Sequence, residues 1–258
     1  MLSREAEKAL EADVISAAFA RAIAAAEAYR GATSPNPPVG CVVLDHEGRE
    51  LAVAAHQRAG EAHAEAKALS LCAMSGTTHL AHTIIVTLEP CNHTGRTPPC
   101  CDAILATPIR HVWIGTADPN GMVKGGGAKR LAAAGLHVRW ISEIDAQLSA
   151  RAAELITPFA KRMRTGIPWV TVKQALDAQG SMIPPAGRKT FTSPASLTLA
   201  HELRKRADAI LTGSGTVLAD HPEFTVRHVA DHPGKQRGLY ILDRRLRVPS
   251  SYFTEAEA

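Results

Sequence analysis

A short buried strand that runs into a cysteine places the strongest constraint on this chain. The β-branched segment 83–88, TIIVTL, predicts that strand, and Cys91 follows it closely. Eight residues separate Cys91 from a second thiol, Cys100, which begins a predicted helix, and His63 opens another predicted helix upstream. One histidine and two cysteines form a zinc-binding set that leaves a fourth position open for water. The sequence therefore predicts a metal centre at His63, Cys91 and Cys100.

Glu65 lies two residues beyond His63 and can supply the acid–base group of a hydrolytic zinc centre. Zinc lowers the pKa of a bound water to ~7, and a carboxylate nearby can take its proton and deliver it to a leaving amine. Zinc deaminases combine H-x-E with P-C-x-x-C, whereas the gap between the cysteines is longer here. Cys101 could replace Cys100 as a ligand, but the position of Cys100 directly after Pro99 favours Cys100.

Composition excludes several classes of protein. The chain has 258 residues and a formal net charge of +4, which is too small to indicate a nucleic-acid partner. No apolar run is long enough to cross a membrane, and the charged N-terminal segment does not read as a secretory signal. The odd number of cysteines, 5, argues against a disulfide framework. We therefore expect a reduced, cytoplasmic protein in which Cys41 and Cys72 are buried packing residues.

An opening hairpin followed by alternating strands and helices indicates a layered α/β domain over residues 1–145. Apolar residues at helical spacing predict an N-terminal packing helix, which ends at Gly31 before a proline-rich turn. The expected helices are 6–29, 61–74, 100–106 and 128–134. The expected strands are 40–45, 51–55, 83–88, 111–116 and 136–141. We expect the site where the strands end, as is usual in open α/β sheets.

A second domain is predicted from residue 166 to residue 258, after a linker helix over residues 146–165. Pro168 and the apolar run behind it predict a strand. Ser193 is the expected N-cap of the next helix, with Pro194 in its first turn. The expected elements are strands at 168–176, 207–213 and 239–243, a helix at 193–206 and a loop at 214–227. We expect a domain of this length to be incomplete as an α/β unit.

Several runs of this sequence closely resemble one enzyme family. HAEAKAL, TLEPCNHTGRTPPC, SPNPPVGCVV and ADPN are similar to the deaminase domain of the bifunctional riboflavin-biosynthesis deaminase/reductases. KRMRTGIPWVTVK and RADAILTGSGTVLADHPEFTVR resemble their reductase domain, so the similarity covers nearly the whole chain. The eight-residue gap between the cysteines is typical of this family. The resemblance implies a cytidine-deaminase-like three-layer α/β/α domain, followed by a partial dihydrofolate-reductase-like α/β domain.

By this resemblance the metal centre is a zinc site with His63, Cys91 and Cys100 as ligands and Glu65 as proton shuttle. The family's substrate is a diamino-ribosylaminopyrimidinone 5'-phosphate, which loses ammonia by hydrolysis. The resemblance also implies a homo-oligomer. The family's substrate contacts fall on Asn36, His56, Ala64, Arg96, Asp118 and Asn120.

The substrate contacts divide by the part of the ligand they hold in the family. Asn36 and His56 match positions at the pyrimidine ring or its ribityl-type tail, whereas Arg96, Asp118 and Asn120 match positions at the ribose phosphate. A guanidinium is a suitable fork for a phosphate monoester. The alternative for Arg96 is a solvated loop charge, and the alternative for Asp118 is a plain Asp-Pro-Asn turn.

Three departures from the family bear on function. The run 121–127, GMVKGGG, replaces the usual V-A-G-[KR]-G, and Lys124 could stand in for its basic residue. The segments 177–180 and 188–193 differ from the reductase's S-L-D-G and S-x-W-I-T-S, and the glycine-rich turn that would cradle NADPH phosphates is missing. Positions that still match the reductase are Lys173, Arg204, Thr216, Asp220 and Arg227. We therefore expect an active deaminase with an inactive, C-terminally truncated reductase half, which argues against NADPH as a cofactor.

Three alternatives stay open. A partner chain could supply the missing half of the reductase and complete a bifunctional enzyme. The shortened domain could instead mediate dimerisation in a binding or scaffolding protein. The same deaminase chemistry could also serve a pteridine or azapteridine branch of secondary metabolism. Nucleic-acid deamination is disfavoured, because the sequence has no stripe of basic and aromatic residues.

Overall fold

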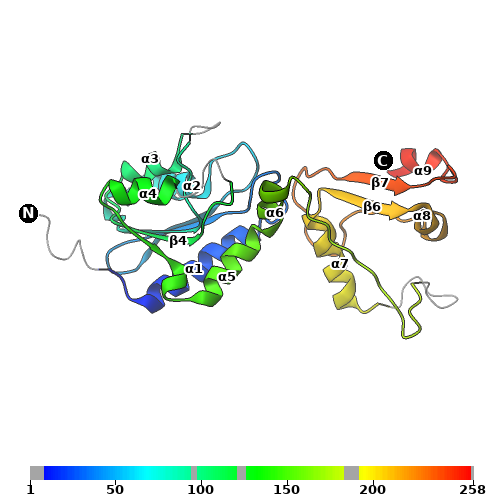
Figure 1. Cartoon of the computed structure of the whole chain (residues 1–258), viewed down its shortest axis with the longest axis horizontal. Helices are drawn as coiled ribbons and strands as arrows, with labels where there is room; N and C mark the ends of the chain where they lie inside the picture. The colour runs from blue at the N-terminus through cyan, green and yellow to red at the C-terminus, as the bar shows by residue number, and fades with distance from the viewer. Residues whose placement is uncertain (1–8, 94–97, 121–125, 183–191, 257–258) are drawn as a thin grey trace, which may run out of the picture. The chain divides into compact units, whose positions relative to one another are not determined.

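The computed structural model describes residues 9–93, 98–120, 126–182 and 192–256. The chain divides into two units, and the first unit ends at Trp169. Within the described residues, five strands form the central sheet of the first unit (Figure 1). In spatial order they are β2 (Glu50–Ala55), β1 (Gly40–Leu44), β3 (Thr83–Leu88), β4 (His111–Thr116) and β5 (His137–Trp140). β1 runs antiparallel to both of its neighbours, whereas β3, β4 and β5 are parallel. The carboxyl ends of β3 and β4 therefore meet at one edge of the sheet.

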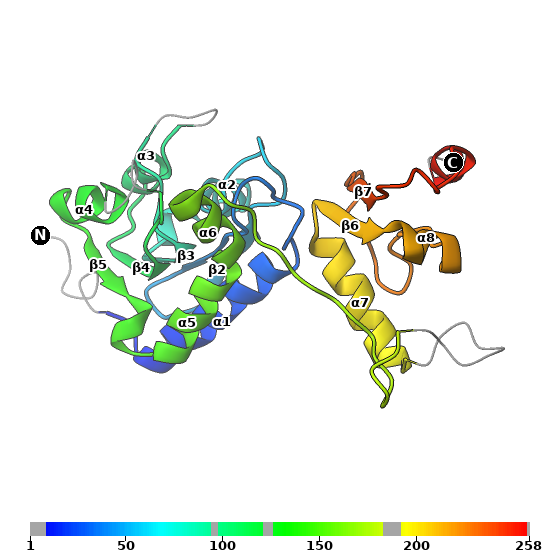
Figure 2. The same cartoon turned by 45° about the vertical axis from the view of Figure 1, so that its right-hand side comes forward.

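Helices cover both faces of this sheet (Figures 1 and 2). One face packs against α1 (Ala12–Glu27) and α5 (Ala146–Leu155), and the other against α2 (Ala64–Met74), α3 (Cys100–Leu105) and α4 (Gly126–Ala133). Two short 3₁₀ turns, Thr78–Leu80 and Ile141–Glu143, join these elements. The three-layer α/β/α architecture implied by the resemblance is confirmed.

Side-chain alternation along the inner strands produces two separate hydrophobic cores. Ile84 and Val86 of β3 lie in the core with α2, α3 and α4, whereas Ile85 lies in the core with α1. Trp113 of β4 joins the α1 core between two neighbours that face the other way. All six positions of β3 are buried, because an inner strand of a sheet with helices on both faces is covered on both sides.

Two expectations for the helices of the first unit are wrong in detail. The N-terminal helix begins at Ala12 and not at residue 6, although residues 1–8 lie outside the described part. The expected linker helix at 146–165 is two helices, α5 and α6 (Thr157–Thr165), with the break at Ile156. Pro158 explains the break, since proline fits the first turn of a helix but not its interior. α5 packs in the same core as α1.

The second unit, which begins at Val170, contains two parallel strands with a helix before, between and after them. Its elements are α7 (Pro194–Arg206), β6 (Ala209–Gly213), α8 (Ser214–Asp220), β7 (Gly238–Leu242) and α9 (Ser251–Ala256). As predicted, the Ser193 side chain caps α7 by accepting a hydrogen bond from the Ser196 amide at 3.2 Å. The expected loop at 214–227 is wrong, because its first half forms α8.

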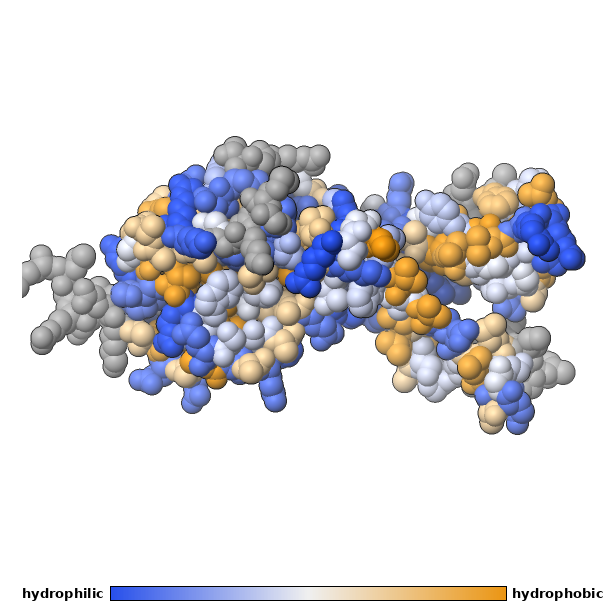
Figure 3. Space-filling model, viewed as in Figure 1, coloured by the Kyte–Doolittle hydropathy of each residue, from blue (hydrophilic) through white to orange (hydrophobic). Residues whose placement is uncertain are grey.

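One face of the β6–β7 pair is open to solvent. Leu211, Tyr240 and Leu242 are between 60% and 66% exposed, and they lie on the same face because Leu211 pairs with Tyr240 in the parallel ladder. Apolar residues gather at the surface of this unit (Figure 3). The strand expected at 168–176 does not form among the described residues. A strand needs a hydrogen-bonded neighbour, and in the described part of the chain β6 and β7 pair only with each other.

Gly115 in β4 tests how closely the sheet packs against α1 and α5. A Cβ atom there would lie 2.3 Å from the Thr87 carbonyl oxygen and 2.8 Å from Ala152 and Phe19 atoms. We expect Gly115→Ala to destabilise the protein by about 1–3 kcal/mol through overpacking. Gly126→Ala is the matched control, because its nearest neighbour would be 3.6 Å away and alanine favours the helix. Urea unfolding followed by circular dichroism measures both, and equal midpoints would contradict the prediction.

Three histidine rings stack where β3, β4 and β5 begin. The His111 ring lies between those of His82 and His137, with centroids 4.8 Å and 4.9 Å away. The His111 side chain is 5% exposed, and its Nε2 atom has no hydrogen-bond partner within the described residues. Burial, together with the two neighbouring rings, lowers the pKa of His111 to about 4. The folded state therefore strongly favours the neutral imidazole.

This burial predicts a loss of stability in acid. Because the folded pKa lies below the unfolded value of ~6.5, the unfolded chain binds the proton first, and stability falls as the pH drops from about 6.5 towards 4. We expect His111→Phe to remove a loss of up to ~3 kcal/mol over that range. His79→Phe, at an exposed histidine, is the control. Urea midpoints at pH 7 and pH 4.5 give the answer, and an equal acid loss in all three proteins would refute it.

Candidate metal centre and substrate pocket

Three side chains converge at the carboxyl edge of the sheet. The ligand atoms of His63, Cys91 and Cys100 all lie within 4.8 Å of one another. The His63 Nδ1 atom is 3.3 Å from the Cys100 Sγ and 3.6 Å from the Cys91 Sγ. One imidazole and two thiols suit a tetrahedral zinc ion with one position left for water. The donor set and its spacing therefore fit the metal that the sequence predicts.

Two helix starts bring these groups together. His63 is the N-cap of α2, and Cys100 is the first residue of α3. Cys91 lies in the loop that leaves β3, and its sulfur accepts a hydrogen bond from the Cys100 amide at 3.2 Å. Each group follows a strand, so the sheet edge fixes all three positions.

The electrostatics of the cluster favour a thiolate at Cys91. Hydrogen bonds from the Cys100 thiol and the His63 ring lower the pKa of Cys91 to about 4. The hydrogen bond to Cys91 also raises the pKa of His63. The Cys100 pKa moves up, because it shares a proton with Cys91 and is buried. A deprotonated sulfur is the form that binds metal.

Glu65 lies against this cluster in the first turn of α2. Its side chain is buried, with 3% exposure, and burial raises the pKa of the carboxyl. A raised pKa brings a carboxyl closer to the range in which it can both accept and release a proton near neutral pH. Ala64, the other residue expected from this turn, is completely buried.

Cys101 does not join the cluster. Its sulfur lies 3.8 Å from the Pro90 carbonyl oxygen and 3.7 Å from that of Gly127, and it is not part of the group of ligand atoms formed by His63, Cys91 and Cys100 among the described residues. Burial raises the pKa of the Cys101 thiol to about 12. Cys101 therefore packs between the loop of Cys91 and α4, and the geometry favours Cys100 in the ligand set.

A cavity of about 230 Å³ opens beside the cluster. Asn36 and His56 line it, and the Asn36 Nδ2 atom lies 3.2 Å from the His56 Nε2. The opposite ring nitrogen of His56 lies 3.1 Å from the Ala62 carbonyl oxygen. Burial lowers the pKa of His56, so its ring is neutral and can take part in directional hydrogen bonds.

The ADPN turn forms another wall of this cavity. Asp118 and Asn120 both line it, and the Asp118 carboxylate accepts a hydrogen bond from the Asn120 amide at 2.8 Å. Burial raises the pKa of Asp118, with a further contribution from the negative charge of Glu89. Arg96 and residues 121–125, including Lys124, lie outside the described residues.

The sequence analysis did not predict several of the residues that line the cavity, among them Phe159, Met163 and Glu89. Phe159 and Met163 come from α6, a helix that was interpreted as a linker. Their spacing of four residues is typical of any packing face, so it carried no specific signal. Glu89 directly follows the predicted strand, and a carboxylate between an apolar strand and Pro90 is the one signal that could have marked it as buried.

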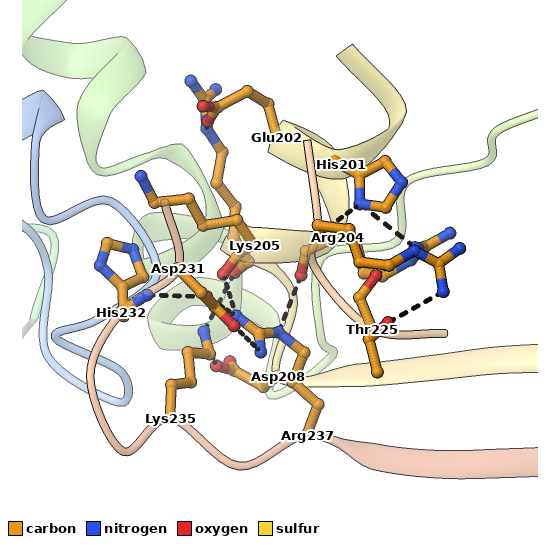
Figure 4. Close-up of polar contacts among 12 residues, drawn as sticks. His201, Glu202, Arg204, Lys205, Asp208, Thr225, Asp231, His232, Lys235 and Arg237 are labelled. Carbon is orange, nitrogen blue, oxygen red and sulfur yellow. Dashed lines mark hydrogen bonds and ion pairs between the residues drawn. The ribbon is translucent and has the colours of Figure 1, made fainter. Parts of the chain in front are cut away.

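The predicted reductase positions lie in the second unit and are only partly brought together. The Arg204 guanidinium donates to the Thr225 carbonyl oxygen at 2.5 Å and lies 3.5 Å from the His201 Nδ1 atom (Figure 4). The same nitrogen of His201 accepts a hydrogen bond from the Arg227 amide. Burial and the nearby arginines lower the pKa of Arg204. Lys173, Thr216 and Asp220 are exposed. The run 188–191 lies outside the described residues.

The same part of the second unit contains a polar network at the end of α7. Arg237 forms a bidentate pair with Asp231 and donates to the carbonyl oxygens of Arg204 and Lys205, both at 2.9 Å (Figure 4). Lys235 pairs with Asp208 at 3.1 Å. These contacts satisfy carbonyl groups that the helix end leaves open. Their role is to stabilise α7.

Comparisons with known proteins divide the chain in the same way. Residues 14–116 match the family model for the cytidine and deoxycytidylate deaminase zinc-binding region. Residues 168–255 match that for the RibD C-terminal domain. The Acinetobacter baumannii RibD structure matches 93% of this chain with a TM-score of 0.77 and 34% identity, over 66% of its own length. A Thermotoga maritima deaminase/reductase matches with a TM-score of 0.76 and 34% identity, over 91% of this chain and 64% of its own.

Curated sequences point the same way. The riboflavin biosynthesis protein RibD of Escherichia coli is 43% identical over 210 residues, which are 81% of this chain and 55% of that protein. RibD of Aquifex aeolicus is 39% identical over 232 residues, which are 89% of this chain and 62% of that protein. The chain is a RibD relative. It spans between about half and two thirds of the length of these relatives. The zinc-binding deaminase-like domain comes first in the chain, and the RibD C-terminal domain follows it.

The positions of the thiols in this RibD relative predict which cysteine variants lose zinc. Cys91→Ser should lose tightly bound zinc, because it removes one of three ligands. Cys101→Ser should retain about one zinc per chain, since that sulfur faces carbonyl oxygens outside the cluster. Atomic emission after dialysis against a weak chelator measures both. Zinc retained by the first variant and lost by the second would show that the ligand set is wrong.

Proposed function

We propose that the first unit is a zinc-dependent aminohydrolase that deaminates the diamino-ribosylaminopyrimidinone 5'-phosphate of riboflavin biosynthesis. The observation that carries this proposal is the convergence of His63, Cys91 and Cys100 beside the buried carboxyl of Glu65. The named relatives of this chain are riboflavin-biosynthesis proteins with the same domain order. We assign His63, Cys91 and Cys100 as the zinc ligands.

The chain's own groups divide the work of hydrolysis. When bound, zinc supplies a water whose pKa is lowered to ~7. Glu65 takes a proton from the attacking water and passes it to the amine, which leaves as ammonia while the ring carbon becomes a carbonyl. Its burial raises the pKa of the carboxyl, which moves it towards the range in which one group can both accept and release a proton. The amine nitrogen leaves with the proton that Glu65 delivers, so the carboxylate is regenerated.

The remaining cavity residues position the substrate. Asn36 and neutral His56 line the side suited to the heteroaromatic ring and its tail. Ala64, which is completely buried, precedes Glu65 in the first turn of α2. Asp118 and Asn120 form the turn on which the ribose phosphate end would rest, together with Arg96. Phe159 and Met163 add an apolar wall from α6, so we place the end of the deaminase domain after α6.

The open face of β6 and β7 favours a second proposal for the other unit. A parallel pair is stable when both of its faces are covered, and here one face exposes three large apolar side chains. Further strands or helices, from the same chain or a partner chain, would cover it and complete a reductase-like domain. NADPH oxidation that depends on the deaminated pyrimidine, and that appears only when such a segment is added, would support this. If no such segment is present, we expect the second unit to be inactive as a reductase.

Ammonia release in the absence of NADPH tests the proposed deaminase. Glu65→Gln should keep one zinc and reduce turnover by about 10²–10⁴-fold, because it removes the group that moves the proton. Glu61→Gln, at an exposed carboxylate of the same segment, should match the parent protein. Equal turnover in both variants would exclude Glu65 from the chemistry. A zinc-loaded parent that releases no ammonia would show that the substrate is a different amine.

A further inference from the structure

Glu89 is a buried carboxylate to which neither the metal cluster nor the proton transfer assigns a role. It follows β3 directly, and its amide donates to the Thr116 carbonyl oxygen at 2.9 Å, which extends the β3–β4 ladder by one step. The side chain is 3% exposed and lines the cavity. A buried carboxylate is costly unless hydrogen bonds satisfy it. The groups that donate hydrogen bonds to the Glu89 carboxylate therefore indicate its role.

Both oxygens of Glu89 accept backbone hydrogen bonds from the two sides of one segment. Oε2 accepts from the Asp118 amide at 3.3 Å, before the turn that carries Asn120. Oε1 accepts from the Ala128 amide at 3.0 Å, in the first turn of α4. A single carboxylate thus fixes the point where the chain leaves β4 and the point where it enters α4.

Other contacts fix α4 against the loop of Cys91. Arg130 donates to the Asn92 side-chain oxygen at 2.7 Å and pairs with Asp102 of α3. Gly127 lies so close that a Cβ atom would be 1.9 Å from the Pro90 carbonyl oxygen. The α4 end of the segment is therefore held several times over. At the Asp118 end, a Glu89 oxygen accepts a hydrogen bond from the backbone amide.

From these contacts we infer that Glu89 is a positioning residue, which sets the Asp118–Asn120 turn against the metal loop so that the turn holds the phosphate end of the substrate. The inference rests on the proposed function. It distinguishes Glu89 from Glu65, because both oxygens of Glu89 are already engaged by amides. A second proton relay would need an oxygen free to face the reacting amine.

Steady-state kinetics of Glu89→Gln test the inference, because an amide cannot accept both backbone hydrogen bonds. We expect the KM for the phosphorylated pyrimidine to rise about 10-fold or more, while kcat stays within about threefold and the zinc content is unchanged. The dephosphorylated substrate should show little change in KM between the two proteins. Glu143→Gln, at a carboxylate that accepts a backbone hydrogen bond outside the cavity, is the matched control.

A double variant separates positioning from general structure. If Glu89 acts through the turn, Glu89→Gln should add little to the KM effect of Asn120→Ala, because residues that act as a unit are not additive. Additive effects, or a fall in kcat like that of Glu65→Gln at constant KM, would overturn the inference. If Glu89→Gln does not fold, Glu89→Asp keeps the charge but shortens the reach, and the same KM criterion applies to it.

Hydrogen exchange gives a readout that does not depend on turnover. The amides of Asp118 and Ala128 should both exchange about 10-fold faster in Glu89→Gln, and no faster in Glu143→Gln. If the zinc-loaded parent releases no ammonia, the proposed function fails, yet the exchange still decides whether Glu89 fixes the turn. Unchanged exchange at the Asp118 amide would overturn the inference whatever the substrate is.

Discussion

The parallel pairing of β3 with β4 is the constraint on which the site depends. Leu88 pairs with Thr116, and the Glu89 amide continues the ladder, so both strands end at the same level. The chain that leaves β3 carries the thiols, and the chain that leaves β4 carries the ADPN turn. Because ladder bonds inside a buried sheet cannot slip without turning every side chain to the other face, the relative position of thiols and turn is fixed by the core.

Two buried glutamates of similar exposure have opposite surroundings at this edge. Burial raises the pKa of the Glu65 carboxyl more than the hydrogen bonds from its own amide and from Cys100 lower it. Glu89 instead accepts two backbone amides. A carboxyl with a raised pKa can exchange a proton, whereas one engaged by amides on both oxygens holds backbone in place. Environment alone therefore separates a group suited to chemistry from a group suited to positioning.

Sequence patterns predicted the first unit well because its signals are local. The β-branched run 83–88 and the hairpin at 40–55 became strands at nearly the expected bounds. The metal cluster could be predicted from the sequence because its combination of residue types is rare. The sequence did not predict the roles of Glu89, Phe159 and Met163, because these roles arise from residues 29 or more positions away in the chain. An isolated carboxylate or an apolar pair at helical spacing does not indicate such distant neighbours.

The second unit shows where local signals fail. The run at 168–176 has the composition of a strand, yet strand formation depends on a neighbour that no local pattern can guarantee. α7 formed as predicted, because its cap at Ser193 and its terminal carbonyl partners lie within the unit. β6 and β7 formed too, but within the described part of the chain each pairs only with the other, and Leu211, Tyr240 and Leu242 stay exposed to water. Burial of apolar surface is the main force that stabilises a sheet. This pair therefore gains less from folding than the five-stranded sheet does, and any segment that covers its open face would bury these three side chains.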